Sequence, residues 1–359
     1  MKKLGVIFGG RSAEHEISIL SASSMIDAVD VSRYETVPIG INKNGDWFLI
    51  KSDMSGIGTL DDPRLSKLIP RDPAGDVHAE PVHPGDIGKL ADFAFPILHG
   101  PCGEDGTIQG LFEMLDMPYS GCGVTGSAVS MDKLLTKDIW NNAGLPIGRY
   151  QGLIIEDFLA DPEREMDRIE DSIPYPVFVK PANMGSSVGV SKAGNRAEME
   201  SAARTAFKFD RRVIVEESTQ GREIEVGVLG NGAPAASVVG EIIPDHNFYD
   251  YESKYVSGLT KLCIPAQIPA DAAERVRELA LEAYFLLDGA GFSRIDCFYD
   301  EKKGNIYLNE MNTIPGFTKF SMFPLLWNES GLAYPDLIER IIELGNERHL
   351  AKNNWKPNY

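Results

Sequence analysis

Two neighbouring runs in the C-terminal part of the chain constrain its fold more than any other feature. They are Ser293-Arg-Ile-Asp-Cys-Phe-Tyr299 and Asn305-Ile-Tyr-Leu-Asn-Glu-Met-Asn-Thr-Ile-Pro-Gly316. Each alternates polar and apolar residues, which predicts two strands joined by a turn. The period of two puts Arg294 and Asp296 on one face of the first strand, and Glu310 and Asn312 on one face of its neighbour. Four polar side chains are therefore expected to converge across a hairpin.

Asp296, Glu310 and Asn312 supply oxygen donors of the kind that a hard divalent cation requires. Mg²⁺ typically takes one or two protein carboxylates and completes its shell with phosphate oxygens and water. A lone acidic residue on a strand is more often simply solvated. Here apolar residues flank the set and a phosphate-binding pattern lies upstream, so we interpret the hairpin as a nucleotide-metal site.

Length and composition favour a multidomain globular protein. The chain has 359 residues, of which 43% are hydrophobic and 25% are charged, and this length predicts two or three domains. No apolar run approaches the roughly 20 residues of a membrane span. The N-terminal apolar run is too short for a signal peptide, so we expect a cytoplasmic protein. The formal charge of -18 argues against nucleic acid or a membrane surface as a partner.

The cysteines and histidines argue against two other classes of site. Cys102, Cys122, Cys263 and Cys297 show no C-x-x-C spacing, and the 6 histidines include no H-E-x-x-H motif. Structural zinc and a disulfide framework are therefore not expected. Any phosphate ligand must be held by local Lys and Arg side chains, backbone N–H groups and a metal ion.

Glycine and proline positions divide the chain. The start predicts a strand, the turn Gly9-Gly10 and a helix from Glu16 to about Val29. Residues 42–86 are expected to form a variable insertion with a short hairpin at Asn44-Gly45. A boundary near Gly121–Gly126 gives the predicted domains 1–121, 122–215 and 216–359. In the last domain we expect a helix from Asp271 to Leu287 that is capped by Asp271 and Glu274.

A second phosphate-binding pattern follows the predicted strand Val177–Lys180. Lys180-Pro-Ala-Asn-Met-Gly-Ser-Ser-Val-Gly189 is rich in glycine and serine and begins with a lysine. Such a loop can lay backbone N–H groups and hydroxyls over phosphates while the lysine supplies a point charge. It lacks the G-x-x-x-x-G-K-[ST] pattern, and it joins strand to strand, so it is not a Walker loop. Taken alone, this turn would more often be a flexible hairpin.

Taken together, the separated motifs resemble one family. Besides the strands and the loop they are Gly9-Gly-Arg-Ser-Ala-Glu14, His99-Gly-x-x-Gly-Glu-Asp-Gly106, Met131-Asp-Lys133 and Phe248-Tyr-Asp-Tyr-Glu-Ser-Lys-Tyr255. The chain resembles the D-alanine–D-alanine ligases of the ATP-grasp superfamily from Leu4 to about Phe323, with the motifs in the family's order. The resemblance implies an α/β (α+β) protein with a three-domain ATP-grasp fold, a Rossmann-like N-terminal domain and a lid at about 244–260.

The resemblance also implies residues for ATP and metal. Lys133 and Lys180 match phosphate-binding lysines, and Ser187 belongs to the phosphate loop. Glu216 and Glu217 match the strand edge that reads adenine, mostly through backbone, and Glu223 matches the ribose ligand. Asp296, Glu310 and Asn312 match the ligands of two Mg²⁺ ions, with Glu310 as the bridge. Mn²⁺ is an alternative metal, and K⁺ a further candidate.

On the substrate side, Glu14 matches the partner of the first D-alanine's ammonium, although a first-turn glutamate favoured by the helix dipole would look the same. His99 matches a residue near that substrate, and Arg294 with the Gly316 amide matches the oxyanion stabilisers. Ser321 and Met322 match the loop that holds the second substrate's carboxylate, and Lys254 matches a substrate-binding residue. Ser186 and Tyr255 match the pair that joins the phosphate loop to the lid.

The implied activity is ATP-dependent ligation of two D-alanine molecules through an acyl phosphate, giving ADP and phosphate for peptidoglycan precursor synthesis. Two alternatives stay open. One is a related ATP-grasp ligase, notably the D-alanine–D-lactate type, which differs at residue 255 and its neighbours. The other is a nucleotide-binding regulatory protein with a degenerate site. The resemblance further suggests a homodimer formed through the N-terminal domain.

Overall fold

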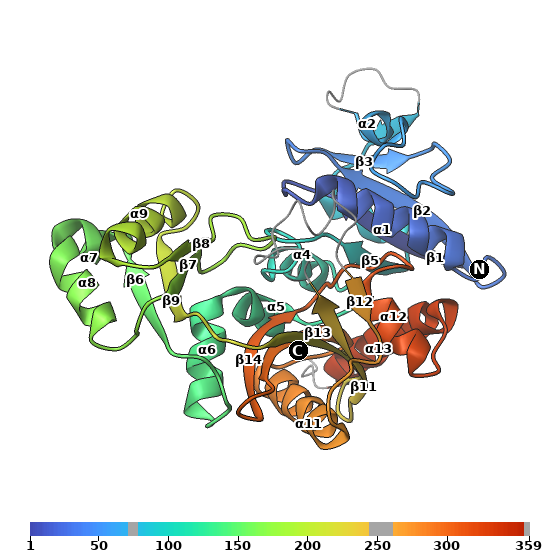
Figure 1. Cartoon of the computed structure of the whole chain (residues 1–359). Helices are drawn as coiled ribbons and strands as arrows, with labels where there is room; N and C mark the ends of the chain where they lie inside the picture. The colour runs from blue at the N-terminus through green and yellow to red at the C-terminus, as the bar shows by residue number, and fades with distance from the viewer. Residues whose placement is uncertain (71–77, 244–260, 355–359) are drawn as a thin grey trace.

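The computed structural model describes residues 1–70, 78–243 and 261–354, and the chain forms three lobes, each built on one sheet (Figure 1). The first lobe lies at the upper right of the view, the second at the left and the third at the bottom. The mixed α/β architecture agrees with the fold class expected from the sequence. The predicted lid, 244–260, lies outside the described residues.

The first sheet has the strand order β4-β3-β2-β1-β5. β2 and β5 run parallel to β1, whereas β3 and β4 continue the sheet in antiparallel fashion. The strands are β1 (Lys2–Gly9), β2 (Tyr34–Ile41), β3 (Trp47–Ile50), β4 (Ala79–Pro81) and β5 (Phe93–Ile97). The predicted hairpin at Asn44-Gly45 is confirmed, since it joins β2 to β3.

A glycine turn carries the chain from β1 into α1 (His15–Ala28), as the sequence predicts. Gly9 has φ +89°, and a Cβ at this position would lie 2.3 Å from the carbonyl oxygen of Ile41. Only glycine fits this approach. The other short elements of the lobe, and the helices that lead to the second sheet, are α2 (Leu65–Leu68), η1 (Pro84–Asp86), α3 (Ile87–Leu90), α4 (Thr107–Met114), α5 (Val124–Met131) and α6 (Lys133–Asn142).

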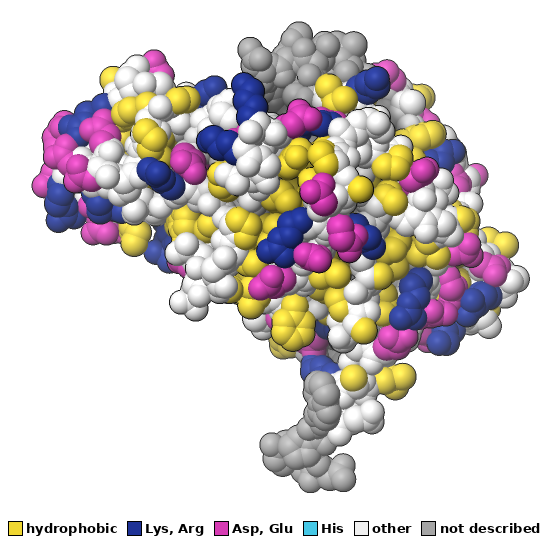
Figure 2. Space-filling model, turned by 60° about the horizontal axis from the view of Figure 1, so that its bottom comes forward, with side chains coloured by type: hydrophobic (Ala, Val, Ile, Leu, Met, Phe, Trp, Pro, Cys, Tyr) yellow, Lys and Arg dark blue, Asp and Glu magenta, His cyan; other side chains and the backbone are white. Residues whose placement is uncertain are grey.

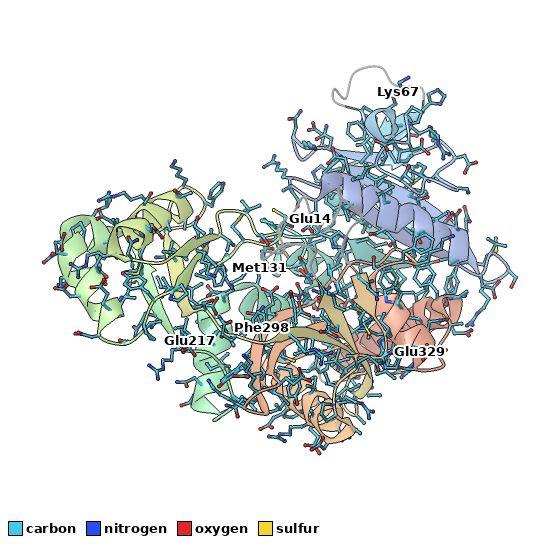
Figure 3. All side chains as sticks on the ribbon, viewed as in Figure 1. Glu14, Lys67, Met131, Glu217, Phe298 and Glu329 are labelled. Atoms are coloured by element: carbon cyan, nitrogen blue, oxygen red, sulfur yellow. The ribbon has the colours of Figure 1, made fainter. Side chains whose placement is uncertain are left out.

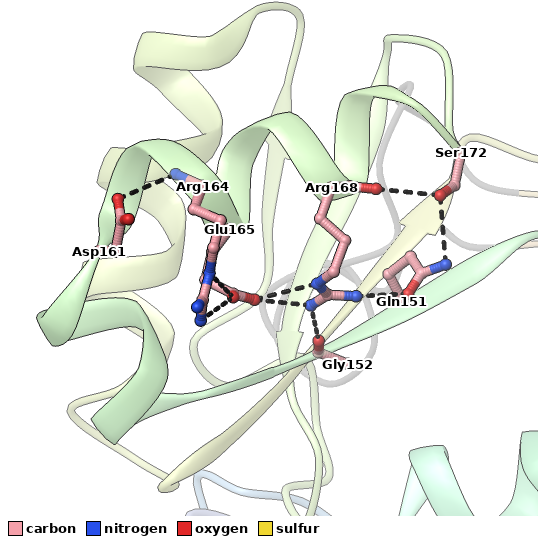
Figure 4. A network of polar contacts seen from close by, with 7 residues as sticks. All are labelled: Gln151, Gly152, Asp161, Arg164, Glu165, Arg168 and Ser172. Carbon is pink, nitrogen blue, oxygen red and sulfur yellow. Dashed lines mark hydrogen bonds and ion pairs between the residues drawn. The ribbon is translucent and has the colours of Figure 1, made fainter.

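The second sheet has the order β6-β9-β7-β8, with every neighbouring pair antiparallel. Its elements are β6 (Tyr150–Ile154), α7 (Ile155–Ala160), α8 (Pro162–Glu170), β7 (Val177–Pro181), β8 (Ser191–Ala193), α9 (Arg196–Ala206) and β9 (Arg212–Glu217). Arg168 ties α8 to β6, because its guanidinium donates to Gln151 Oε1 at 2.6 Å and to Gly152 O at 2.5 Å (Figure 4). Glu165 accepts a further bond from Arg168 at 2.9 Å.

The third sheet is antiparallel, with the order β12-β11-β10-β13-β14. Its elements are β10 (Arg222–Leu229), β11 (Ala235–Ile243), β12 (Lys261–Cys263), α11 (Ala270–Leu286), β13 (Phe292–Asp300), β14 (Asn305–Asn312), α12 (Met322–Glu329) and α13 (Tyr334–Asn354). The predicted cap of α11 is wrong. Pro269 occupies the N-cap position without a side-chain hydrogen bond, and Glu274 instead accepts from Arg277 at 2.7 Å.

Hydrophobic packing crosses the domain boundaries that we propose at 121/122 and 215/216. Trp140 of α6 is fully buried with the core of the third sheet, and its indole N–H donates to Ala283 O at 3.2 Å. Leu337 and Ile341 of α13 pack into the core of the first lobe. α13 therefore holds the third lobe against the first, and α6 holds the segment that leads to the second sheet against the third.

The lower face of the molecule carries Lys and Arg side chains interspersed with Asp and Glu (Figure 2). On α11, Arg275 pairs with Glu278 at 2.9 Å and Arg277 pairs with Glu274 at 2.7 Å. Within the described part of the chain, we find no helix that combines the length and the apolar character needed to cross a membrane.

Candidate active site

A cavity of about 840 Å³ lies where the three lobes meet. Glu14 from the first lobe, Met131 at the end of α5 and Phe298 of β13 all line it, and Figure 3 shows these three residues at the centre of the molecule. Most of the residues predicted from the sequence lie around this one space. Among the predicted residues within the described ranges, those absent from the lining are Asp296, Ser321 and Met322.

The predicted convergence across the hairpin is confirmed. β13 and β14 pair so that Arg294 lies opposite Asn312, and Asp296 lies opposite Glu310. The buried Asp296 carboxylate accepts from Arg294 Nε and Nη2, both at 2.7 Å, and from Asn312 Nδ2 at 2.9 Å. A register shift follows directly after Asp296, where β14 carries one extra residue before the pairing continues at Cys297 and Leu308.

Glu225 of β10 is a second carboxylate beside Arg294 that the sequence reasoning missed. Its Oε2 lies 3.0 Å from Arg294 Nε, and its side chain is almost completely buried. Burial by itself would lower the pKa of Arg294, but Asp296 and Glu225 outweigh burial and raise this pKa well above its ordinary value. The guanidinium is therefore permanently charged and is held between two strands. Glu225 lies two residues after Glu223 on β10, so the period of two along a strand could have placed both carboxylates on the same face.

Lys180 is the last residue but one of β7 and forms an ion pair with Glu216 of β9, with 2.6 Å between Nζ and Oε2. Lys137 of α6 lies on the other side of the same carboxylate, with 2.9 Å between Nζ and Oε1. Burial would raise the pKa of Glu216, but the two lysines outweigh it and hold this pKa far below its usual range. Lys137 was not predicted from the sequence. It follows Lys133 by four residues, one helical turn later, which was the available signal.

Lys133 begins α6 and reaches the loop between β7 and β8. Its Nζ donates to Met184 O at 2.7 Å and lies 3.9 Å from Glu310 Oε2. Asp132 caps the helix by accepting from the amides of Leu134 and Leu135, and it pairs with Arg212 at 2.6 Å. The ammonium group of Lys133 therefore bridges the loop between β7 and β8 and the carboxylate-bearing hairpin.

The loop predicted to hold phosphate does join strand to strand, β7 to β8. Ser186 and Ser187 adopt left-handed backbone conformations with φ +54° and +58°, and both line the cavity. Two consecutive non-glycine residues of this kind are rare and cluster at functional sites. The backbone at this loop is thus held in a special shape that faces the cavity.

β9 is not an edge strand, so the expected strand edge at Glu216 and Glu217 is wrong. β6 and β7 pair on either side of β9, and the Glu217 amide donates to Arg149 O at 3.0 Å. The Glu217 carboxylate accepts from the Arg149 amide at 2.9 Å. Glu217 and Glu223 nevertheless both line the cavity.

Glu14 occupies the N-cap position of α1 and is 8% exposed. A Cβ on Gly185 would lie 3.9 Å from Glu14 Oε2 and 3.9 Å from Gly100 Cα, so the loop between β7 and β8 lies directly against the first lobe at this point. His99 is also buried, and its Nδ1 lies 3.0 Å from Ile314 O. The structure thus brings Glu14, His99 and the loop of Ser186 to one side of the cavity.

Gly316 lies beside Ser321, since a Cβ on Gly316 would be 3.2 Å from Ser321 Oγ. Ser321 is the N-cap residue of α12, and its hydroxyl accepts from the Thr318 amide at 3.1 Å. The Met322 side chain is buried against Ile242. Met322 is the first residue of the helix, where backbone N–H groups have no intrahelical acceptor. Lys254 and Tyr255 lie outside the described residues.

The hairpin fits a divalent cation by its donor types. Asp296 and Glu310 face each other in register, and Asn312 adds an amide oxygen beside them. Among the residues that the structure describes, no group of three or more His, Cys, Asp or Glu side chains forms a metal cluster. Two carboxylates and an amide match an ion that takes few protein ligands and several phosphate or water oxygens.

Comparison with known proteins agrees with this geometry. Residues 3–122 match the family model described as D-ala D-ala ligase N-terminus, and residues 139–343 match the one described as D-ala D-ala ligase C-terminus. The chain belongs to the D-alanine–D-alanine ligase family. The D-alanine–D-alanine ligase of Bacillus cytotoxicus is 44% identical over 99% of this chain and 98% of its own length. That of Geobacillus kaustophilus is 45% identical over 98% and 96%.

Solved structures of this family have the same fold. The VanG D-Ala:D-Ser ligase from Enterococcus faecalis superposes with a TM-score of 0.83 at 34% identity, covering 96% of this chain and 99% of its own. The D-alanine-D-alanine ligase from Coxiella burnetii gives 0.82 at 33% identity, with 99% and 98% covered. This ligase family therefore has an ATP-grasp fold with members that join D-alanine to different second substrates.

Proposed function

We propose that this protein joins two D-alanine molecules into D-alanyl-D-alanine with consumption of ATP, giving ADP and phosphate for peptidoglycan precursors. The observation that carries the proposal is the convergence of three kinds of group on one cavity. Glu14 comes from the first lobe, the pair Lys133 and Lys180 comes from the segment that forms α6 and β7, and Arg294 comes from the third lobe. The relatives at 44% and 45% identity are named as D-alanine–D-alanine ligases.

The chemistry requires activation of a carboxylate, which by itself is a poor electrophile. The γ-phosphoryl group moves from ATP to a carboxylate oxygen of the first D-alanine, and ADP leaves. The amine of the second D-alanine then attacks the acyl carbon, forming the C–N bond, and the C–O bond to phosphate breaks. The amine proton passes to a base, for which Ser186 and Tyr255 are our candidates. Glu14 pairs with the ammonium group of the first D-alanine.

Arg294 and the Gly316 amide stabilise the tetrahedral oxyanion in this proposal. The guanidinium is already fixed by Asp296 and Glu225, so its charge needs no reorganisation during the reaction. His99 and Lys254 are proposed to bind substrate. Ser321, through its hydroxyl, and Met322, through its N–H, hold the second substrate's carboxylate.

Lys133, Lys180 and the loop with Ser187 hold the phosphates of ATP, while Glu216, Glu217 and Glu223 shape the nucleoside end. Asp296, Glu310 and Asn312 would hold two Mg²⁺ ions, which neutralise charge on the transferred phosphoryl group. Mn²⁺ would serve in place of Mg²⁺, and K⁺ is a further candidate activator. We also propose a cytoplasmic homodimer, with neither nucleic acid nor membrane as a partner.

A D-alanine–D-serine ligase is the second candidate, because the VanG protein from Enterococcus faecalis is a D-Ala:D-Ser ligase and its structure matches this one with a TM-score of 0.83. The relatives named as D-alanine–D-alanine ligases are more similar in sequence, at 44% against 34% identity. We therefore favour D-alanine as the second substrate.

ADP release, followed with each substrate in turn, tests the proposal. The purified protein is incubated with ATP, Mg²⁺ and D-alanine, alone or with L-alanine, D-serine or D-lactate, and the products are identified by mass. We expect ADP and D-alanyl-D-alanine in equal amounts from D-alanine alone. Lys180→Met should remove most of this activity, whereas Lys208→Met, an exposed lysine, should leave it unchanged. Exclusive formation of D-alanyl-D-serine, or no D-alanine-dependent ADP, would contradict the proposal.

A further inference from the structure

The backbone N–H and C=O of Ile314, just beyond β14, are both bound by side chains of the loop His99–Gly106. Glu104 Oε1 accepts a hydrogen bond from the Ile314 amide at 3.2 Å. His99 Nδ1 lies 3.0 Å from the Ile314 carbonyl oxygen. A carbonyl oxygen only accepts, so this contact requires the proton of the imidazole to be on Nδ1. Two side chains of the first lobe thus fix both the N–H and the C=O of one residue in the third.

The Glu104 carboxylate is itself fixed by its own loop. Its second oxygen, Oε2, accepts from the Gly100 amide at 2.7 Å. The loop is held further by Gln109, whose Nε2 donates to Gly103 O at 2.8 Å. Glu104 therefore connects its own loop to the amide of Ile314, which lies 210 residues further along the chain.

Phe317 anchors the same segment from the other end. Its ring is 1% exposed and lies 5.6 Å from the ring of Phe95 and 5.9 Å from that of Phe292. Its carbonyl oxygen accepts from the Tyr334 hydroxyl at 2.6 Å. Gly316, which lines the cavity, thus lies between an aromatic anchor and the Ile314 peptide.

We propose that Glu104 is a positioning residue, which acts with His99 to hold the Ile314 peptide and thereby the Gly316 amide where the oxyanion forms. This inference rests on the ligase reaction proposed above. An amide that donates to a transition-state charge is effective only if its direction is fixed before the reaction. Glycine has no side chain to fix it, so the neighbours on either side must do so.

The charge state of Glu104 suggests a conservative replacement. Burial, together with the charges of Glu14 and Glu310, raises the pKa of Glu104 to about 8. Hydrogen bonds from the amides of Gly100 and Ile314 lower this pKa, but they do not outweigh burial. At pH 7 the carboxyl group is therefore largely neutral in the ligand-free protein. Glutamine is neutral and has the same length, and its single carbonyl oxygen can still accept from the Ile314 amide. Methionine has similar bulk and accepts no such bond.

The test compares Glu104→Gln, Glu104→Met and Gln109→Met. Gln109→Met is the matched control, because it removes a buried hydrogen bond from the same loop without touching Ile314. Two quantities are measured: steady-state kinetics with D-alanine and ATP, and amide exchange of residues 313–317 in the ligand-free protein.

We expect Glu104→Met to lower kcat on the order of 100-fold, as for loss of an oxyanion donor, with an unchanged KM for ATP. Amide exchange at Ile314 and Gly316 should rise in this variant and not in Gln109→Met. Glu104→Gln should keep most of the wild-type kcat and most of the wild-type protection from exchange at Ile314 and Gly316. Unchanged exchange in Glu104→Met, or an equal kcat loss in Gln109→Met, would overturn the inference. If the wild type fails to ligate D-alanine, the proposed function fails instead, while exchange still tests the connection to Ile314.

Discussion

Glu216 Oε2 lies 2.6 Å from the Nζ of Lys180, so a lysine proposed to bind phosphate is already paired in the ligand-free protein. Such a pair alone would be neutral and would attract a polyphosphate weakly. Lys137 changes this balance, because its Nζ lies 2.9 Å from the other oxygen of Glu216 and leaves the three groups with one net positive charge. The pKa of Lys180 is raised, since Glu216 outweighs burial, which would lower it.

Lys137→Met should therefore weaken ATP binding. A unit charge about 4 Å from another is worth about 4 kcal/mol at an effective dielectric near 20, so its removal should raise the KM for ATP by at least about tenfold. The KM for D-alanine should change little. Steady-state kinetics with each substrate varied in turn would measure both, with the exposed Lys208→Met as the control. Equal KM values for ATP in Lys137→Met and wild type would contradict this account.

Glu310→Gln should nearly abolish turnover while the fold is retained. Glu310 faces the buried Asp296 and is itself partly exposed to the cavity, so it contributes little packing. Its loss removes a carboxylate of the proposed metal site, and a drop of at least about 100-fold in kcat is expected. ADP production is measured at saturating ATP and Mg²⁺, with the melting temperature as the check on folding. Wild-type turnover in this variant would rule out the metal assignment.

Asp132 and Asp161 offer a paired test of stability. Asp161 caps α8 through the Arg164 amide, and its replacement by alanine should cost about 1 kcal/mol. Asp132 caps α6 and also pairs with Arg212, so Asp132→Ala should cost more, about 2 to 3 kcal/mol. Thermal unfolding of both variants provides the comparison. Equal shifts in melting temperature would mean that the ion pair with Arg212 adds nothing to the cap.

Glu104 predicts a pH dependence of stability with a definite sign. In the unfolded chain this carboxyl group loses its proton near pH 4.5, whereas in the fold burial and the charges of Glu14 and Glu310 raise its pKa to about 8. Between these values the folded state binds more protons, so the free energy of unfolding falls as pH rises. In Glu104→Gln the side chain does not titrate, so this decrease in the free energy of unfolding is absent.

The melting temperature of Glu104→Gln relative to wild type should therefore rise from pH 5 to pH 8 in the ligand-free protein. Other groups titrate equally in the two proteins, so the difference isolates Glu104. Parallel curves for variant and wild type would show that the pKa of Glu104 is not raised in the fold.

The sequence predicted the parts of the site that depend on local period. The two-residue alternation put Arg294 and Asp296 on one face of a strand, and the observed register against Glu310 and Asn312 agrees. The strand-to-strand loop after Lys180 is likewise a local feature. The roles of these residues in catalysis remain predictions.

The parts that the sequence did not predict depend on packing between distant segments. Lys137 and Glu225 are buried charged residues, and the local period that accompanies them is shared by many solvated surface residues. Glu104 is joined to the site through a contact with Ile314, which is distant in the sequence. The cap of α11 was assigned to Asp271 from a local pattern, but the chain enters that helix through Pro269. The expectation that Glu216 lies on an edge strand was wrong because β6, which lies upstream in the sequence, pairs with that side of β9.

Transfer of an isotope label from substrate to phosphate tests the central claim most directly. D-alanine with ¹⁸O in both carboxylate oxygens is incubated with the protein, ATP and Mg²⁺, and both products are weighed by mass spectrometry. If the carboxylate is phosphorylated and then attacked by the second amine, each D-alanyl-D-alanine formed is accompanied by one phosphate that carries one ¹⁸O. Unlabelled phosphate, or phosphate released without dipeptide, would contradict the account.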